Sequence, residues 1–128
     1  MKLKSPHIPL GITFEEGLKI LQTVSSEIER FDEDNEDFYR ASSDEFSCGF
    51  YLKSGLVSST WYDDPTGRDS EDGINLKVTL YLQRCGDISE WEDGINNGWI
   101  QFFTNEKSGV GLAYGLHKDV IRFNQIDK

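Results

Sequence analysis

The cleanest pattern of apolar and polar positions lies at residues 74–82, Ile-Asn-Leu-Lys-Val-Thr-Leu-Tyr-Leu. Every even-numbered position is apolar, and the odd-numbered positions between them are polar or amphipathic. Successive side chains leave a β-strand on opposite faces, so a period of two predicts a half-buried strand. We therefore expect residues 74–84 to form the central strand of an antiparallel sheet.

A helical period comes earlier in the chain, over residues 13–31. Thr13-Phe-Glu-Glu16 matches a capping box, in which the Thr13 hydroxyl and the Glu16 carboxylate bind otherwise unpaired backbone amides. Apolar side chains then recur at helical spacing, which predicts one amphipathic helix over about residues 13–31. These side chains are Phe14, Leu18, Leu21, Ile28 and Phe31.

The period of two returns in several short segments. Ser54-Gly55 reads as a tight turn that joins two of these segments into a hairpin. Residues 86–98 form an irregular acidic connection with room for one helical turn. A helix followed by adjacent strands predicts an α+β fold, with one N-terminal amphipathic helix packed on an antiparallel sheet of about five to six strands. The further predicted strands are 38–41, 46–53, 56–62, 99–104, 110–114 and 120–125.

Composition adds few constraints to this picture. At 128 residues the chain fits a single domain, residues 1–128, and eight Phe, five Tyr and three Trp supply large core side chains. Its two cysteines, Cys48 and Cys85, form no CxxC pair, and we expect Cys48 to be a small buried apolar residue. No apolar run has the length of a signal peptide or a membrane span. We therefore expect a reduced, cytoplasmic protein without a membrane partner.

Candidate chemistry is sparse. His117-Lys-Asp119 could pair a general base with an orienting carboxylate, although surface or turn residues are the simpler interpretation. The acids at 32, 34 and 36 fit no calcium loop, because Asp37 and Ser43 stand where an EF-hand needs Gly and Glu. No zinc, nucleophile-elbow, Walker or dinucleotide motif is present. We expect no catalytic residue, metal or cofactor, and a protein that is not an enzyme.

Charge is the strongest signal. With 23 acidic and 13 basic residues the net charge is −10, which repels nucleic acid and anionic membranes and attracts basic partners. The acids concentrate in residues 27–45 and 63–93, with Trp91 nearby as a possible aromatic anchor. We favour segments 63–73 and 32–37 as one partner-binding surface. The candidate residues are Asp32, Glu33, Asp34, Glu36, Asp37, Asp63, Asp64, Asp69, Glu71, Asp72 and Trp91.

A strand pair rich in Trp and Gly carries a family resemblance. Gly98-Trp-Ile-Gln-Phe-Phe-Thr-Asn-Glu106 and Gly111-Leu-Ala-Tyr-Gly-Leu116, in a small acidic α+β chain, resemble bacterial immunity proteins, above all those of contact-dependent growth inhibition systems. The resemblance implies a cytoplasmic protein that binds one cognate toxin, commonly a nuclease with a basic cleft, and neutralises it.

Two alternatives remain open at this point. One is a DNA mimic that inhibits a nucleic-acid-binding protein, which requires carboxylates spaced like duplex phosphates. The other is a small-ligand-binding or enzymatic domain, with a pocket between helix and sheet that contains His117 or Asp119. The sequence leaves the oligomeric state open, and a monomer is the simpler expectation.

Overall fold

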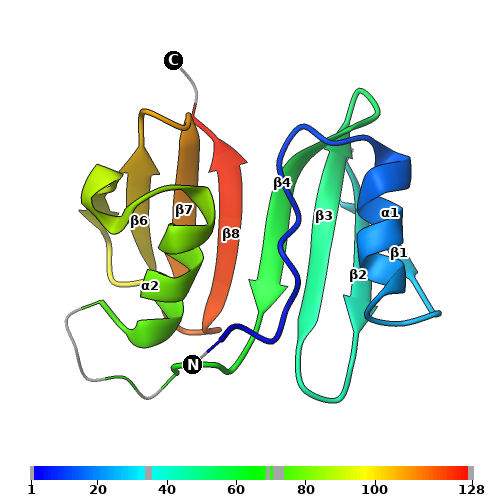
Figure 1. The fold of residues 1–128 in the computed structure, drawn as a ribbon, viewed down its shortest axis with the longest axis horizontal. Coiled ribbons are helices and arrows are strands. Elements are labelled where there is room, and N and C mark those ends of the chain that lie inside the picture. The colour runs from blue at the N-terminus through cyan, green and yellow to red at the C-terminus, as the bar shows by residue number, and fades with distance from the viewer. Residues whose placement is uncertain (1, 34–35, 69, 71–73, 127–128) are drawn as a thin grey trace.

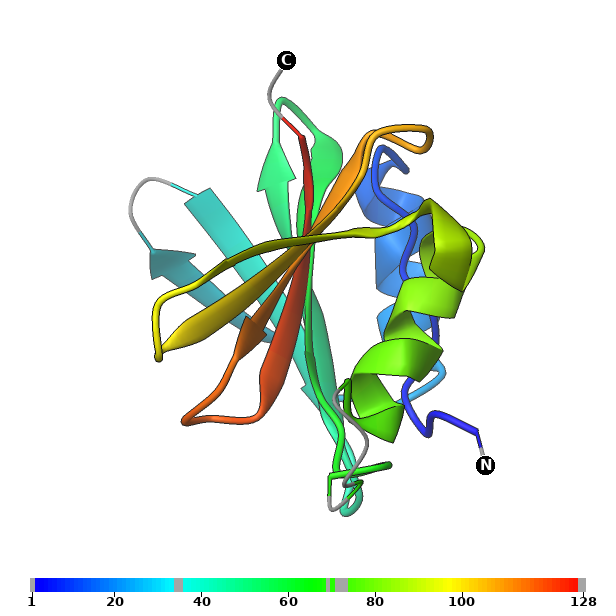
Figure 2. The same cartoon turned by 90° about the vertical axis from the view of Figure 1, so that its left-hand side faces the viewer.

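The computed structural model describes residues 2–33, 36–68, 70 and 74–126. Within them the chain forms one eight-stranded antiparallel sheet in the order β1-β2-β3-β4-β8-β7-β6-β5. Helices α1 and α2 cover one face of the sheet (Figure 2). The strands are β1 (Glu29–Glu33), β2 (Glu36–Ser42), β3 (Ser47–Lys53), β4 (Leu56–Asp63), β5 (Glu92–Asn96), β6 (Ile100–Asn105), β7 (Val110–Gly115) and β8 (Val120–Gln125). The α-helices are α1 (Phe14–Gln22) and α2 (Leu76–Leu82), and two short 3₁₀ helices follow α2, η1 (Gln83–Cys85) and η2 (Ile88–Glu90).

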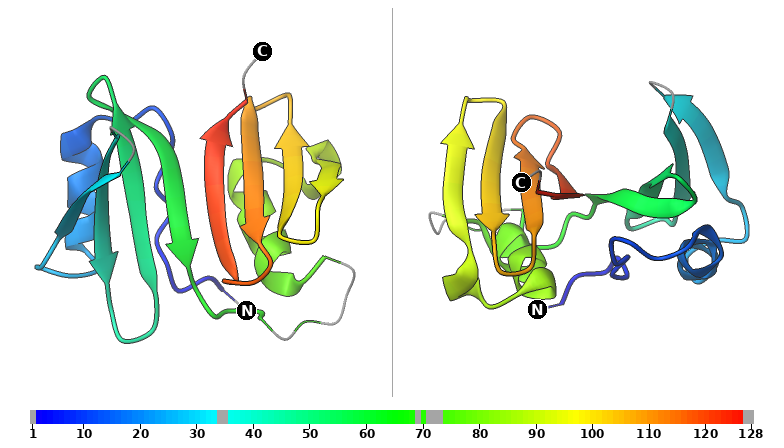
Figure 3. Two further views of the ribbon diagram at one scale, coloured as in Figure 1. Left: turned by 180° about the vertical axis from the view of Figure 1, so that it is seen from behind. Right: turned by 90° about the horizontal axis from the view of Figure 1, so that it is seen from above.

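The same order of elements occurs twice. Residues 14–63, the first half, form helix α1 and the four-stranded meander β1–β4, and residues 76–125, the second half, form α2 and the meander β5–β8. The halves meet where β4 pairs with β8, with Tyr62 opposite Ile121 (Figure 1). Seen from above, the outer strands of both halves bend away from the helices (Figure 3). The α+β prediction is confirmed, but the sheet has more strands than expected.

Residues 76–82 form helix α2, so the predicted central strand at 74–84 is wrong. Asn75 caps the helix, because its Oδ1 accepts a hydrogen bond from the Val78 amide at 3.0 Å. The alternating apolar residues fit a strand, but the residues that the helix buries are at i, i+1, i+4 and i+5, which is a helical stripe. They are Lys77, Val78, Tyr81 and Leu82. Two of them stand at positions that the strand interpretation assigned to solvent.

The first helix is shorter than predicted. The capping box of Thr13 and Glu16 is present, but α1 ends at Gln22 rather than near residue 31. The Ser25 hydroxyl accepts a hydrogen bond from the Glu27 amide at 3.1 Å, a local bond that competes with the helix. Phe31 therefore lies in β1, an unpredicted edge strand, and its ring packs on Phe38 of β2 at 6.0 Å.

The remaining strands follow the predicted period of two. Ser54 and Gly55 both have positive φ, 56° and 79°, as the tight turn between β3 and β4 requires. Cys48 is fully buried, as predicted. Residues 92–96, expected to be irregular, instead form the edge strand β5, which pairs with β6 in a shifted register. None of the helices in the described part of the chain has the length and apolar content needed to cross a membrane.

The N-terminal segment lies between the two helices and crosses β4 (Figure 1). Ile8 is buried against the core, and its amide donates to the Tyr62 hydroxyl at 2.9 Å. Asp64 accepts hydrogen bonds from the Ser5 amide at 2.9 Å and from the Ser5 hydroxyl at 3.0 Å. The segment thus completes the core where the halves meet.

Candidate functional site

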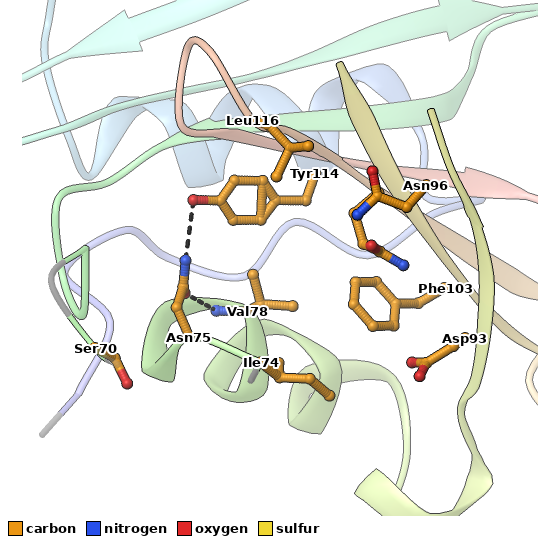
Figure 4. Close-up of a pocket in the computed structure, with 10 residues that line it drawn as sticks. Ser70, Ile74, Asn75, Val78, Asp93, Asn96, Phe103, Tyr114 and Leu116 are labelled. Carbon is orange, nitrogen blue, oxygen red and sulfur yellow. Dashed lines mark hydrogen bonds between the residues drawn. The ribbon is translucent and has the colours of Figure 1, made fainter. Parts of the chain in front are cut away.

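A cavity of about 360 Å³ lies between the N-terminal turn of α2 and strands β5–β7 (Figure 4). Ile74 and Val78 form its wall on the helix side, and Leu116 follows the end of β7. Phe103 projects from β6 toward the helix, because it belongs to the buried face of that strand. One side of the cavity is therefore apolar.

The opposite wall is polar and comes from the β5–β6 hairpin. Asp93 lies opposite Phe103 in the register, and Asn96 lies opposite Gln101. Asn96 Oδ1 accepts from the Gly98 amide at 2.9 Å, which leaves its amide nitrogen to face the cavity. Asp93 forms no ion pair with any lysine or arginine of the described residues. This wall therefore presents a carboxylate whose charge nothing in the described structure neutralises.

A buried cluster of charges borders the cavity. The Lys77 side chain is 0% exposed, and its Nζ lies 3.2 Å from Asp119 Oδ1. Arg68 Nε donates to Asp119 Oδ2 at 2.5 Å, and the Tyr114 hydroxyl donates to Oδ1 at 2.5 Å. Asn75, the helix cap, donates to the Tyr114 hydroxyl at 2.9 Å. These bonds fasten the start of α2 to the turn between β7 and β8.

The pKa values in this cluster follow from burial and charge. Burial lowers the pKa of Lys77 below its ordinary value of 10.5, although Asp119 opposes the shift. Burial alone would raise the pKa of Asp119, but hydrogen bonds from Tyr114 and Arg68 bring it below 3.8. Burial and Asp119 together raise the pKa of Tyr114 to about 12. Lys77 and Asp119 thus form a salt bridge that fixes structure.

His117 and Asp119 take separate roles in the 116–119 turn. The His117 ring packs on the Trp99 ring at 4.5 Å, whereas the Asp119 oxygens bind Tyr114, Arg68 and Lys77. The hydrogen bonds of the described residues include none between His117 and Asp119, and the cavity is lined by neither. The geometry does not assemble the base and orienting carboxylate that the sequence spacing allows.

Three exposed apolar side chains lie on or next to segments that line the cavity, and one of them, Leu116, lines it directly. Ile95 is 74% exposed, Trp99 68% and Leu116 41%. The Leu116 amide donates to the Trp99 carbonyl at 2.9 Å, so the two residues stand side by side. We call these three residues the apolar rim. The segment Asn96-Asn97-Gly98 directly before Trp99 marks a hairpin turn, where side chains are commonly exposed.

The structure separates the two acidic segments that we expected on one surface. Asp37 pairs with Leu52 beside the β3–β4 turn, whereas Asp63 pairs with Ser47 at the other end of β3. Asp32 is exposed near Asp37, which binds Arg30 at 2.7 Å. Glu36 lies with them in the β1–β2 hairpin. Asp34, Asp69, Glu71, Asp72 and the side chain of Glu33 lie outside the described residues.

Two further predicted residues face the interior. Asp64 is 0% exposed. Burial alone would raise its pKa, but hydrogen bonds from Thr66 and Ser5 lower it below 3.8. Trp91 is half-buried against the core, and its Nε1 donates to the Leu82 carbonyl at 2.9 Å. Both residues hold the fold together, so neither is available as an exposed contact.

Asp63 is the predicted residue that stays near the cavity. The β2–β3 turn, the 97–99 turn and the 116–119 turn reach the same end of the sheet, at the bottom of Figure 1. We call this the cavity end. Asp44, Glu45 and Asp63 line a second, more open depression of about 300 Å³ there. Carboxylates, a cavity and exposed apolar side chains therefore gather at one end of the molecule.

Comparisons with protein-family models, with curated proteins and with solved structures found no match to this chain. In the part of the chain that the structure describes, no group of three or more His, Cys, Asp or Glu side chains could hold a metal ion.

Proposed function

We propose that this protein is a cytoplasmic immunity protein that binds a cognate bacterial toxin at the cavity end and neutralises it. The observation that carries the proposal is the apolar rim near an unneutralised carboxylate. Trp99 is 68% exposed, although indole rings are normally sheltered in proteins. Exposed aromatic side chains beside a pocket are typical anchors of protein–protein interfaces.

Charge identifies the kind of partner. The net charge of −10 favours a basic surface, such as the active-site cleft of a nuclease toxin. Asp44, Glu45 and Asp63 line a separate depression at the same end of the sheet, from which they can help to attract a basic partner. Asp32, Glu36 and Asp37 lie at the opposite end and are not part of the proposed interface. The proposed contact is thus smaller than the surface expected from sequence.

A second candidate function is the binding of a small polar ligand. Its support is the cavity itself, whose volume of about 360 Å³ falls in the range of small-molecule sites and whose walls combine apolar and polar groups. In the first function a side chain of the protein partner fills the cavity, whereas in the second a free small molecule fills it. No observation favours a DNA mimic, because the described acids are divided between two ends of the sheet.

The proposal predicts that a toxin is encoded next to this chain, and the domain of such a toxin is the partner for the test. Cells that express the domain should survive only when the chain is present, and the purified pair should bind with an on-rate that falls as salt rises. Trp99→Ala should weaken binding roughly 30-fold or more, the effect of removing an aromatic anchor.

Leu56→Ala is the matched control, because Leu56 is an exposed apolar residue, 46% exposed, beside the β3–β4 turn at the opposite end. Its binding should equal that of the unchanged chain. Failure of the chain to bind or protect would overturn the function. Equal effects of the two substitutions would overturn the interface.

A further inference from the structure

We infer that the cavity receives the guanidinium group of an arginine side chain supplied by the partner. This inference rests on the proposed function and names the chemistry of the contact. It depends on the arrangement of the cavity walls, on the hydrogen-bonding groups that remain free in them and on the aromatic ring between them.

The walls match a side chain with an apolar stem and a charged head. Val78 and Leu116 offer apolar surface on one side, and Asp93 and Gln101 offer oxygen atoms on the other. An arginine can bury its methylene groups along such a wall while its guanidinium reaches the polar side. A wholly apolar side chain would make no ion pair with the Asp93 carboxylate, which is exposed in the free chain.

The free polar groups include acceptors on Asp93 and Gln101 as well as the amide nitrogen of Asn96. Asn75 Nδ2 donates one of its two hydrogens to the Tyr114 hydroxyl, and the Tyr114 hydroxyl donates its proton to Asp119. Gln101 Nε2 donates to the Phe102 carbonyl at 3.4 Å, which leaves Gln101 Oε1 free to accept. Asp93 contributes two more acceptor atoms. An anion would meet these oxygens unfavourably, whereas a guanidinium supplies five donors and a positive charge.

The aromatic side chain in the cavity favours a planar cation. Phe103 lies opposite Asp93 in the strand register, so a guanidinium bound to the carboxylate comes near the ring of Phe103. Cations are attracted to the faces of aromatic rings, and the planar, weakly hydrated guanidinium stacks there more readily than the compact ammonium of lysine. Phe103 is 4% exposed, so its ring adds an aromatic edge to the site while the Asp93 carboxylate supplies the main attraction for arginine.

Several described acids have no ion pair, and Asp93 is the one of these that lines the cavity. Asp37, Glu29, Glu90 and Asp119 each have a cationic partner within the molecule. Asp93 has none among the described residues, although it lies in a cavity where a bound cation would be partly shielded from water. A guanidinium from outside would complete the same kind of pair at this wall of the cavity.

The direct test titrates the purified chain with N-acetyl-arginine-N-methylamide and follows backbone amide resonances by NMR. The matched probe is the citrulline compound, which has the same shape and no charge. We expect the arginine probe to shift amides of 93–103 and 114–116 and to bind at least tenfold more tightly than the citrulline probe. Equal binding of the two probes, or binding of neither, would overturn the inference.

Two variants test whether the carboxylate of Asp93 is the charge that binds the arginine probe. Asp93→Asn should reduce arginine binding at least tenfold. Glu92→Gln removes the same charge one residue earlier, where the strand alternation turns the side chain to the other face, and should leave binding unchanged. Asp93 is exposed, so both variants should fold alike, which a thermal melt checks. Equal effects of the two variants would overturn the inference.

The inference and the proposed function can fail separately. If Trp99→Ala abolishes toxin binding while Asp93→Asn retains it, the rim is the interface and no arginine enters the cavity. If the arginine probe binds but the unchanged chain neither binds nor neutralises the toxin, the immunity function is wrong. The cavity then serves a free guanidinium compound, which supports the second candidate function.

Discussion

The two halves share one order of elements but hold their helices in different ways. In the first half α1 lies close to the sheet, because Gly17 leaves room for the Phe50 ring: an added Cβ would stand 2.9 Å from it. Phe14 fills the next space, with its ring 4.9 Å from that of Tyr39. In the second half hydrogen bonds and a salt bridge fasten the start of α2, and a cavity remains beside it.

This difference shows how one architecture can serve stability in one place and binding in another. Apolar contacts beneath α1 leave no space for a ligand and contribute in proportion to the area they bury. Val78, Tyr81 and Leu82 pack α2 into the core, and the polar bonds at its start hold that end without filling the space next to it. The candidate site therefore belongs to the half in which packing is incomplete.

The largest expected contrast comes from shortening one apolar side chain under each helix. Leu21→Ala removes a fully buried side chain of α1 and should lower the free energy of unfolding by about 2–5 kcal/mol. Ile74→Ala removes a half-buried side chain that already borders the cavity and should cost roughly 1 kcal/mol or less. Urea unfolding measures both, and equal losses would mean that the second half is packed as tightly as the first.

An intermediate loss of stability is expected when the charge of Asp119, which holds the start of α2, is removed. Asp119→Asn should cost roughly 1.5–3 kcal/mol at neutral pH, because a hydrogen-bonded carboxylate beside buried Lys77 is lost. Asp119 has φ +55°, a conformation that Asn also tolerates, so the substitution isolates the charge. Urea unfolding at pH 7 measures the loss, and an unchanged midpoint would contradict the role of this carboxylate.

The pH dependence of this variant follows from the lowered pKa of Asp119. In the folded state the pKa lies below 3.8, so the carboxylate stabilises fully above that value, and its contribution is lost as pH falls through the folded-state pKa. The unchanged chain should therefore lose stability below about pH 4 more steeply than the variant. Parallel stability curves between about pH 5 and pH 2 would show that Asp119 does not carry this role.

The smallest difference in stability is expected between variants that remove the N-cap side chain of each helix. Thr13→Ala removes an exposed cap of α1 and should cost about 0.5–1 kcal/mol. Asn75→Ala removes the cap of α2 and also the hydrogen bond to Tyr114, so about 1–2 kcal/mol is expected. Thermal melts of the two variants compare them. A larger loss for Thr13→Ala would contradict the view that polar bonds fasten the second helix.

Sequence reasoning reached the local patterns and missed the long-range ones. The Thr13 capping box, the Ser54-Gly55 turn and the strands from 36 to 63 depend on near neighbours, and the sequence predicts them correctly. Helix α2 was missed because its burial depends on partners far along the chain: Lys77 is buried only because Asp119 is 42 residues away in sequence and adjacent in space. The repeated architecture left no visible repeat in the residues.

For the candidate site, too, the sequence predicts the local features and not the contacts between distant segments. Charge pointed to a basic partner, but Asp37 and Asp63 lie at different ends of the sheet, because the distance between two acidic segments depends on strand order and direction. Asp64 reads like its neighbour Asp63, and only the folded position of the N-terminal segment shows that it is an internal acceptor. Asp93 and Gln101 come together through a register that no local pattern encodes.

The position of β8 has a consequence for how the protein is made. It is the last strand along the printed sequence, yet it lies in the middle of the sheet, between β4 and β7. A ribosome therefore releases seven strands before the one that joins them, and until then β4 and β7 each present an unpaired edge. The sheet of the nascent chain is completed only when β8 emerges, and loss of residues 120–125 would expose two strand edges at once.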